Sequence, residues 1–315
     1  MTFDIGLSTS WNSWREPDVD KMIDEIISYG FNSVELDFAL AKKSVDRMIE
    51  LVNTGKIKVS SLHNFCPIPD DPDVPYLSPN IFPISSKDPD ERSKGVRYTC
   101  QTIDYATRLG AKAIVMHIGK VPVKNRTVDL LRLLEQDRQD TRKFMRIKLK
   151  LLREREKYRE TYLNYTLQSL EEINNYAVGK NILVGIENRN FAHEIPDLEE
   201  ADYILRHFDG GNLRYWHDVG HAQIMENIGI FSHDEYVNFF KNRIAGIHIH
   251  DIVRGRDHRA PGSGLFDFGR IKDFLTADII KVIEVHHPTS PRELKSGVQF
   301  LKTFFEKELN SDKKE

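Results

Sequence analysis

Two kinds of hydrophobic pattern take turns along the whole chain: short segments with a period of two residues, and longer segments with a period of three to four residues. Short runs with a period of two predict strands, and longer runs with apolar residues three or four positions apart predict helices. Residues 18–29, for example, place their apolar side chains on one side of a helix, and Gly30 follows as a helix-ending residue. The chain is therefore predicted to alternate strand and helix throughout.

Eight strand–helix units result from this pattern. We predict strands over residues 3–8, 32–37, 57–63, 113–117, 181–187, 213–218, 244–251 and 279–284. We predict helices over residues 18–29, 45–52, 97–109, 128–178, 198–208, 234–242, 266–275 and 291–309. Eight such units are typical of an α/β fold, the (β/α)8 TIM barrel, here one domain over residues 1–310 with a polar tail at 311–315.

Two segments exceed ordinary connections between these elements. The loop from residue 64 to about 89 holds seven of the thirteen prolines, and its length favours a functional or capping role. A long helical insertion, about residues 124–178, follows the fourth strand. Nine Lys or Arg and two Glu lie between Arg142 and Arg159. A solvated helical hairpin explains this charge, with a nucleic-acid contact or a subunit contact as alternatives.

Composition narrows the class of protein. The net charge of -3 gives no general attraction for nucleic acid, so we expect no such partner. Cys66 and Cys100 form no disulfide framework, the first residues carry no secretory pattern, and no run is apolar enough to span a membrane. We expect a cytoplasmic protein that acts on a small molecule, without a membrane partner; assembly into a homo-oligomer stays open.

Acid, base or metal-binding side chains end six successive predicted strands. They are His63, His117, Glu187, Asp218 with His221 three residues further on, His250 and Glu284. In a barrel, the carboxyl ends of the strands meet at one mouth, where active sites form. His117 alone could be a hydrogen-bonded core histidine, and Glu187 an ion-pair partner of Arg189. Burying charge is costly unless it is paired or coordinated, so the joint placement predicts a functional site.

The seventh strand carries the densest chemistry. By strand alternation, Gly246, His248 and His250 share one face, and Ile247 and Ile249 share the other. The following loop, residues 252–264, is rich in Arg, His and Gly, as is typical of a loop that faces a substrate.

The chain resembles the xylose-isomerase-like TIM barrel superfamily, which holds sugar isomerases and epimerases, inosose dehydratases and apurinic-site endonucleases. The resemblance covers nearly the whole chain apart from the helical insertion. It rests on the motifs Ile186-Glu-Asn188, Asp218-Val-Gly-His221, His248-Ile-His250, Pro261-Gly-Ser-Gly264 and Ile283-Glu284.

The resemblance to ketose 3-epimerases of this type implies one divalent metal ion, held from strands five to eight. Its implied ligands are Glu187, Asp218, His250 and Glu284. It also implies that His221 contacts the substrate, together with an arginine in the loop after strand seven. Counting forward from His250 favours Arg256, and counting back from the Pro-Gly-Ser-Gly motif favours Arg259, so both stay candidates.

This mostly oxygen-donating set favours Mn²⁺ or Mg²⁺, with Co²⁺ or Zn²⁺ as further candidates. Such an ion would bind a substrate carbonyl and the adjacent hydroxyl and make the carbon between them more acidic. Glu187 and Glu284 could then remove and return the proton through an enediolate. Trp11 and Trp14 form either an apolar wall against the sugar or packing at the rim. We therefore expect a metal-dependent isomerase or epimerase of a sugar or polyol ketone.

The main alternative is an apurinic-site endonuclease-like zinc phosphodiesterase, whose family uses three zinc ions and nine ligands. The matching positions here are His63, His117, Glu187, Asp218, His221, His250, His258 and Glu284. The departure is Arg256, which stands where an acid is expected two residues before His258, while Asp257 is displaced by one. For an isomerase, His63, His117 and His258 are substrate-site residues instead. A sugar-binding barrel without catalysis is the third alternative.

Overall fold

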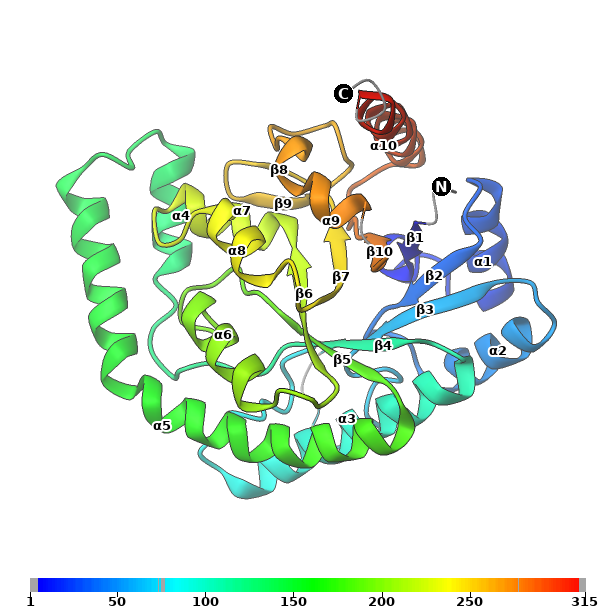
Figure 1. Ribbon diagram of the computed structural model, residues 1–315, viewed down its shortest axis with the longest axis horizontal. Helices are drawn as coiled ribbons and strands as arrows, with labels where there is room; N and C mark the ends of the chain where they lie inside the picture. Colours follow the sequence, from blue (N-terminus) through cyan, green and yellow to red (C-terminus); the bar gives the residue numbers. More distant parts are fainter. Residues whose placement is uncertain (1–4, 73, 75–76, 277, 312–315) are drawn as a thin grey trace.

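Eight parallel strands close into a barrel in the computed structural model (Figure 1), which describes residues 5–72, 74, 77–276 and 278–311. The strands are β1 (Gly6–Ser8), β2 (Ser33–Leu36), β3 (Lys58–His63), β4 (Ala113–Met116), β5 (Leu183–Glu187), β6 (Leu213–Asp218), β7 (Ile244–Ile249) and β10 (Ile280–Ile283). They pair in chain order around the barrel, and β10 closes it against β1. The predicted (β/α)8 barrel is confirmed, and each barrel strand lies within a predicted one.

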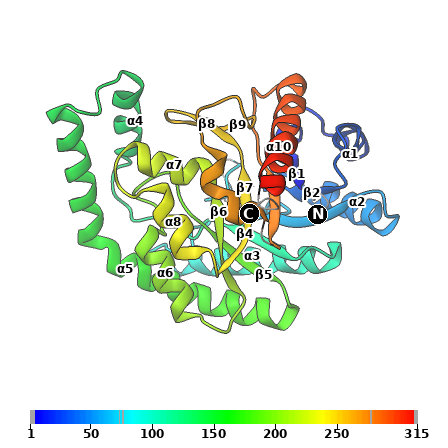
Figure 2. The same cartoon turned by 45° about the horizontal axis from the view of Figure 1, so that its top comes forward.

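Helices surround the barrel on its outer side (Figure 2). They are α1 (Val19–Ser28), α2 (Lys42–Asn53), α3 (Pro89–Leu109), α4 (Thr127–Glu135), α5 (Arg142–Lys180), α6 (Leu198–His207), α7 (Val219–Asn227), α8 (His233–Phe240), α9 (Lys272–Thr276) and α10 (Pro291–Ser311), with 3-10 turns η1 (Thr9–Trp11) and η2 (Phe268–Ile271). No helix of the described residues is long and apolar enough to cross a membrane. The predicted polar tail lies outside the described residues except for Ser311, which ends α10.

Three local predictions need correction. Helix α3 begins eight residues before the expected residue 97, because Pro89 starts the helix and Asp88 caps it. Helix α7 was not expected: Asp218, the last residue of β6, accepts the His221 backbone N–H at 2.7 Å and so caps a helix directly. The seventh strand stops at Ile249, and the segment after it forms an antiparallel hairpin, β8 (Asp251–Val253) with β9 (Arg256–Arg259).

The helical excursion after β4 is two helices rather than one continuous run. Residues 136–141 separate α4 from α5, where Asp137 adopts φ 55° and the Thr141 side chain caps α5. An ion pair of Arg126 with Glu154, at 2.9 Å, joins α4 to α5. Both views show the second half of α5 running beside α3 and its first half standing beside α4, toward the β8–β9 hairpin (Figures 1 and 2).

Apolar side chains fill the part of the barrel that lies away from the carboxyl ends of the strands. Trp216 is fully buried there with Ala113, Val115 and Val282. A side chain at Gly246 would overlap the Trp216 ring, so glycine is required for this packing. Toward the carboxyl ends of the strands, the side chains inside the barrel are charged rather than apolar. This charged region is the candidate functional site.

Candidate metal centre and active site

Four donor side chains converge at the carboxyl end of the barrel. Atoms of Glu187, Asp218, His248 and Glu284 that could bind a metal ion lie within 4.8 Å of one another, and all four residues are buried. Each follows from strand alternation: Glu187 shares the inward face of β5 with Gly185, and His248 shares that of β7 with Gly246.

His248 stands at the centre of this group. Its Nδ1 lies 2.9 Å from Glu187 Oε1 and 3.0 Å from Glu284 Oε2, and its Nε2 lies 3.0 Å from Glu35 Oε1. Burial favours the neutral imidazole, but the carboxylates of Glu284 and Glu35 outweigh it and raise the pKa of His248 well above its usual value. This part of the barrel therefore favours a positive charge.

The donor set fits a divalent cation. Oxygen ligands bind Mg²⁺ or Ca²⁺ at about 2.0–2.6 Å, so two ligands of one ion lie at most about 5 Å apart. The four donor atoms, within 4.8 Å of one another, satisfy that limit. Three carboxylates around one imidazole also match the oxygen-rich chemistry that such ions prefer.

His250, the histidine implied as a ligand, lies beside this group. Its Nε2 is 3.0 Å from both carboxylate oxygens of Asp218, and its Nδ1 accepts the His258 backbone N–H at 2.9 Å. Its ring stacks on that of His258, with 4.3 Å between ring centroids. The structure thus brings His250 to Asp218, and places His248 among the four converging donors. The metal-ligand role of His250 stays a prediction.

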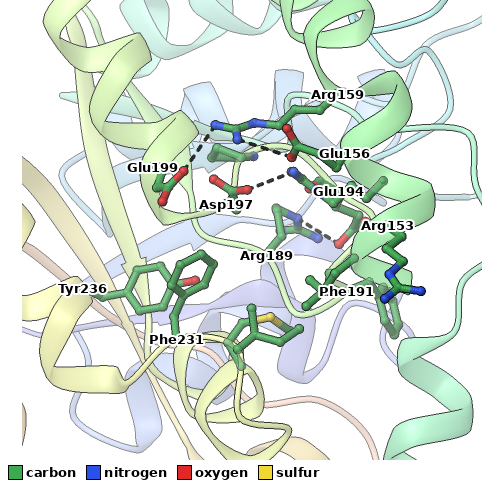
Figure 3. Close-up of a pocket in the computed structure, with 16 residues that line it drawn as sticks. Arg153, Glu156, Arg159, Arg189, Phe191, Glu194, Asp197, Glu199, Phe231 and Tyr236 are labelled. Carbon is green, nitrogen blue, oxygen red and sulfur yellow. Dashed lines mark hydrogen bonds and ion pairs between the residues drawn. The ribbon is translucent and has the colours of Figure 1, made fainter. Parts of the chain in front are cut away.

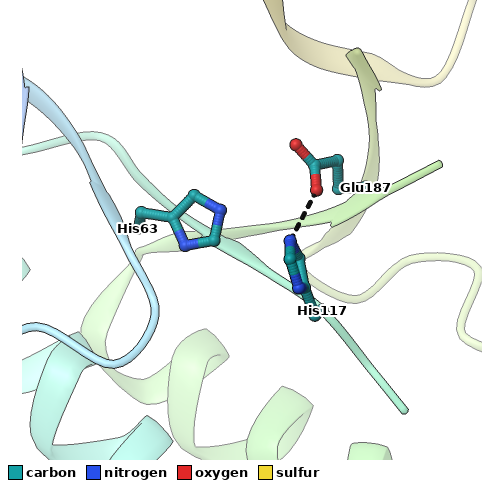
Figure 4. A group of neighbouring side chains, drawn as sticks. All are labelled: His63, His117 and Glu187. Atoms are coloured by element: carbon teal, nitrogen blue, oxygen red, sulfur yellow. Dashed lines mark ion pairs between the residues drawn. The ribbon is translucent and has the colours of Figure 1, made fainter. Parts of the chain in front are cut away.

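A second donor group adjoins the first through Glu187. His63 and His117, from the ends of β3 and β4, lie with Glu187 close enough to share one ion (Figure 4). His117 Nε2 is 2.9 Å from Glu187 Oε2, and its Nδ1 is 3.1 Å from Asn80 Oδ1 of the proline-rich loop. Burial and the nearby Arg189 lower the pKa of His117 to about 3, so this imidazole is neutral.

Two further groups share His258 of the hairpin. One combines Asp218, His221 and His258, and the other combines His258 with Glu284 and His286. Asp257 joins the first, because its carboxylate lies 3.2 Å from His258 Nδ1 and 3.9 Å from His221 Nε2. The one-residue displacement of this acid in the sequence therefore does not remove it from the site.

The other predicted substrate-binding residues are less central. Arg256 is largely exposed and pairs with Glu135 at the end of α4, at 2.8 Å, so the structure does not bring it to the donor groups. The Nε of Arg259 is buried without a hydrogen-bond partner among the described residues. Trp11 is 1% exposed and donates to the Thr289 carbonyl oxygen, as in the packing interpretation, whereas Trp14 is exposed beside His287.

Sequence reasoning missed two acids at the mouth, and it named Arg189 only as an ion-pair partner of Glu187, a pair that the structure contains. Glu35, fully buried on β2, accepts from the Ser61 hydroxyl at 2.7 Å and lies against His248. Asp37 follows β2, and burial raises its pKa to about 6. Arg189 donates to Glu187 and, at 3.3 Å, to Glu194. The signal for Glu35 was present, since it is an acid in the middle of an otherwise buried strand.

Comparison with known proteins gives one family and several structures. Residues 23–304 match the family model described as xylose isomerase-like TIM barrel. A D-tagatose 3-epimerase-like protein superposes with a TM-score of 0.69 at 20% identity, over 96% of this chain and 97% of that one. The 3-keto-D-glucoside 4-epimerase of E. coli gives 0.66 at 15% identity, over 96% and 100%. The D-psicose 3-epimerase of Clostridium cellulolyticum H10 gives 0.65 at 13%, over 95% and 98%. No curated protein sequence matches the chain.

Proposed function

Because the chain belongs to the xylose isomerase-like TIM barrel family, we propose that it is a sugar isomerase or epimerase that depends on a divalent metal ion. The observation that carries the proposal is the convergence of Glu187, Asp218, His248 and Glu284 at the barrel mouth. The structural neighbours named as a D-psicose 3-epimerase, a 3-keto-D-glucoside 4-epimerase and a D-tagatose 3-epimerase-like protein support a ketose or keto-sugar as substrate class.

The glutamates are the proposed acid and base. Glu187 and Glu284 reach His248 Nδ1 from β5 and from the end of β10, so they approach the same space from different strands. One removes the proton from the carbon beside the substrate carbonyl, and the other returns a proton to the enediolate. A bound divalent ion would supply Lewis acidity toward the carbonyl.

The remaining polar groups position these carboxylates and the substrate. Arg189 donates to Glu187, and Glu35 holds His248 from the opposite side. His221 is fixed through its Nδ1, 2.9 Å from the Asn188 carbonyl oxygen, which leaves its Nε2 for a substrate hydroxyl. The side chain of Asn80 joins the proline-rich loop to His117, with 3.1 Å between Oδ1 and Nδ1.

The decisive experiment measures carbon-bound proton exchange. Protein loaded with Mn²⁺ is incubated in D₂O with D-tagatose, D-psicose, D-fructose and an inosose, and deuterium at the carbon beside the carbonyl is followed by NMR. We expect exchange with at least one keto-sugar and its loss in Glu187→Gln. Glu306→Gln, at an exposed position of α10, is the matched control. Absence of exchange with every substrate contradicts the proposal.

A zinc phosphodiesterase is the second candidate, and one observation favours it. The four donor groups share Glu187, Asp218, Glu284 and His258, so the mouth offers sites for more than one ion. Metal analysis of protein purified without chelator separates the two functions: about one ion per chain supports the isomerase, and about three zinc ions support the phosphodiesterase. Cleavage of a duplex that contains an abasic site, together with no carbon-proton exchange, would establish the second function.

A further inference from the structure

A cavity of about 370 Å³ lies between α5 and the segment that follows β5 (Figure 3), and Arg189, which donates to Glu187, is part of its wall. Its walls come from α5, from the segment between β5 and α6, from the start of α6, and from α7, α8 and the loop that joins them. None of the converging donors Glu187, Asp218, His248 and Glu284 lines it. The volume falls in the range of small-molecule sites, and a ligand here would not contact these four donors directly.

Apolar side chains form one end of this cavity. Phe191, Met225, Ile230 and Phe231 line it together with the ring of Tyr236. Figure 3 shows Phe191, Phe231 and Tyr236 on the side opposite to the charged pair Arg159 and Glu199. A ligand body that fills this end must be apolar, because these walls offer it few polar atoms.

Every acidic side chain of the cavity already has an arginine partner. Glu194 pairs with Arg189 at 3.3 Å, and Asp197 pairs with Arg155 at 2.9 Å. Glu156 and Glu199 both pair with Arg159, at 3.6 and 3.5 Å. A cationic ligand would have to compete with these arginines for each carboxylate, so the cavity does not favour a cation.

Three donor groups of the cavity can serve a ligand. Arg153, at the edge of the cavity in Figure 3, is exposed and forms no ion pair within the described residues. The buried Arg155 Nε–H has no hydrogen-bond partner among them, and the hydroxyl of Tyr236, a side chain only 2% exposed, is a further donor in the lining. Buried polar groups are nearly always hydrogen-bonded, so the unpaired Arg155 Nε–H indicates an acceptor that comes with a ligand, and Arg153 adds a positive charge that no carboxylate of the described residues pairs with.

We propose that this cavity binds a small carboxylate that carries an apolar ring or branched chain. The apolar body occupies the space between Phe191, Phe231 and Met225. The carboxylate lies toward Arg153 and Tyr236, which supply a positive charge and a hydrogen-bond donor. A neutral ligand leaves the arginine unpaired, and a cation is repelled by it.

Three ligands with the same ring test the charge requirement by titration calorimetry: phenylacetate, phenylacetamide and phenethylammonium. Hexanoate and 3-methylbutanoate extend the series to apolar chains. We expect saturable binding of at least one carboxylate, with one site per chain, and weaker binding of the amide and the amine. Equal binding of all three ring compounds, or no binding of any carboxylate, overturns the proposal.

Variants locate the site. Arg153→Gln should weaken carboxylate binding by about 3–5-fold, the scale of an exposed ion pair, and leave amide binding unchanged. Tyr236→Phe should weaken it by about 2–10-fold, the scale of one hydrogen bond. Ala192→Trp, which fills the cavity, should abolish it. Arg146→Gln, an exposed arginine on the same helix outside the cavity, is the matched control and should change nothing.

This binding is independent of the proposed reaction. It should persist in Glu284→Gln and in protein stripped of metal, since Glu284 neither lines the cavity nor pairs with a residue that does. A carboxylate that competes with a keto-sugar, or that loses affinity when the metal is removed, binds at the barrel mouth instead and contradicts the second site.

Discussion

Arg155 fastens the long insertion helix to the barrel, and its replacement by methionine tests this role. The guanidinium donates to Asp197 at 2.9 Å, to Glu200 at 2.5 Å and to the Glu194 carbonyl oxygen at 3.0 Å. Asp197 and Glu200 also form the capping box of α6. One buried side chain of α5 therefore holds the start of α6 in place.

Removing one partner of a buried ion pair costs about 3–5 kcal/mol, because the other charge stays buried and unpaired. Glu200 is fully buried, but Arg159 Nε remains 3.2 Å away, so Arg155→Met should cost about 3 kcal/mol. With an unfolding entropy of about 2.1 cal/mol/K per residue, the 315-residue chain should lose about 4–5 °C in Tm.

The pH dependence checks the cause. Burial already raises the pKa of Glu200, and loss of the Arg155 charge should raise it further. When the pKa of a carboxyl group is higher in the folded state than in the unfolded state, the folded protein is most stable at low pH. This stability is lost as the pH rises through the folded-state pKa. The deficit of Arg155→Met should therefore be smaller at pH 5 than at pH 8.

Thermal unfolding, followed by circular dichroism and by tryptophan fluorescence, measures both the loss of Tm and its dependence on pH. Arg153→Met is the matched control, because Arg153 is exposed two residues away on the same helix and forms no ion pair with the described residues. We expect it to change Tm by less than about 1 °C. If both variants lose the same stability, or if the Arg155→Met deficit does not depend on pH, the ion-pair explanation is wrong.

Three other predictions follow from single sites. Gly246→Ala should cost about 1–3 kcal/mol in urea unfolding, because the new methyl overlaps Trp216, whereas Gly179→Ala, in open space on α5, should be neutral or stabilise by up to about 1 kcal/mol. Glu187→Gln should lower kcat by at least about 10²-fold with its substrate, and an unchanged kcat excludes it as the base. A hydrogen bond from Arg270 lowers the pKa of Glu226 to about 2, so its stabilisation exists at neutral pH and is lost as the pH falls from its ordinary 4.5 toward 2. Wild type and Glu226→Gln should therefore differ in urea unfolding at pH 7 and converge near pH 2.

The barrel was predictable because its strands are buried and repeat regularly. Each strand had to bury an outer face against helices, and that requirement appears as runs such as Ile182 to Ile186. Helix starts were harder to predict. Asp218 looks like a strand-end ligand, yet its carboxylate also caps α7, and one residue with two roles gives no separate sequence signal.

The position of the site was predictable, but individual side chains were not. Strand ends in a barrel meet at one mouth whatever the loops do, so Glu187, Asp218 and Glu284 could be grouped from the sequence. Arg256 depends instead on a hairpin whose turn directs it to Glu135 of α4, on a distant part of the chain. Glu35 is recognisable as an acid within a buried strand, but its partners, Ser61 of β3 and His248 of β7, come from other strands, and alternation within β2 does not identify them.

His248 and His250 show the limit most clearly. Both lie on the inward face of the predicted strand, and alternation alone cannot separate them, although β7 ends at Ile249 in the structure. In the structure, His248 contacts Glu35 and Glu187 and lies 3.7 Å from Asp218, whereas His250 contacts Asp218 and the hairpin. Asp218 is therefore within reach of both rings. The carboxylates that stand beside each ring come from other strands, and alternation within one strand does not place them.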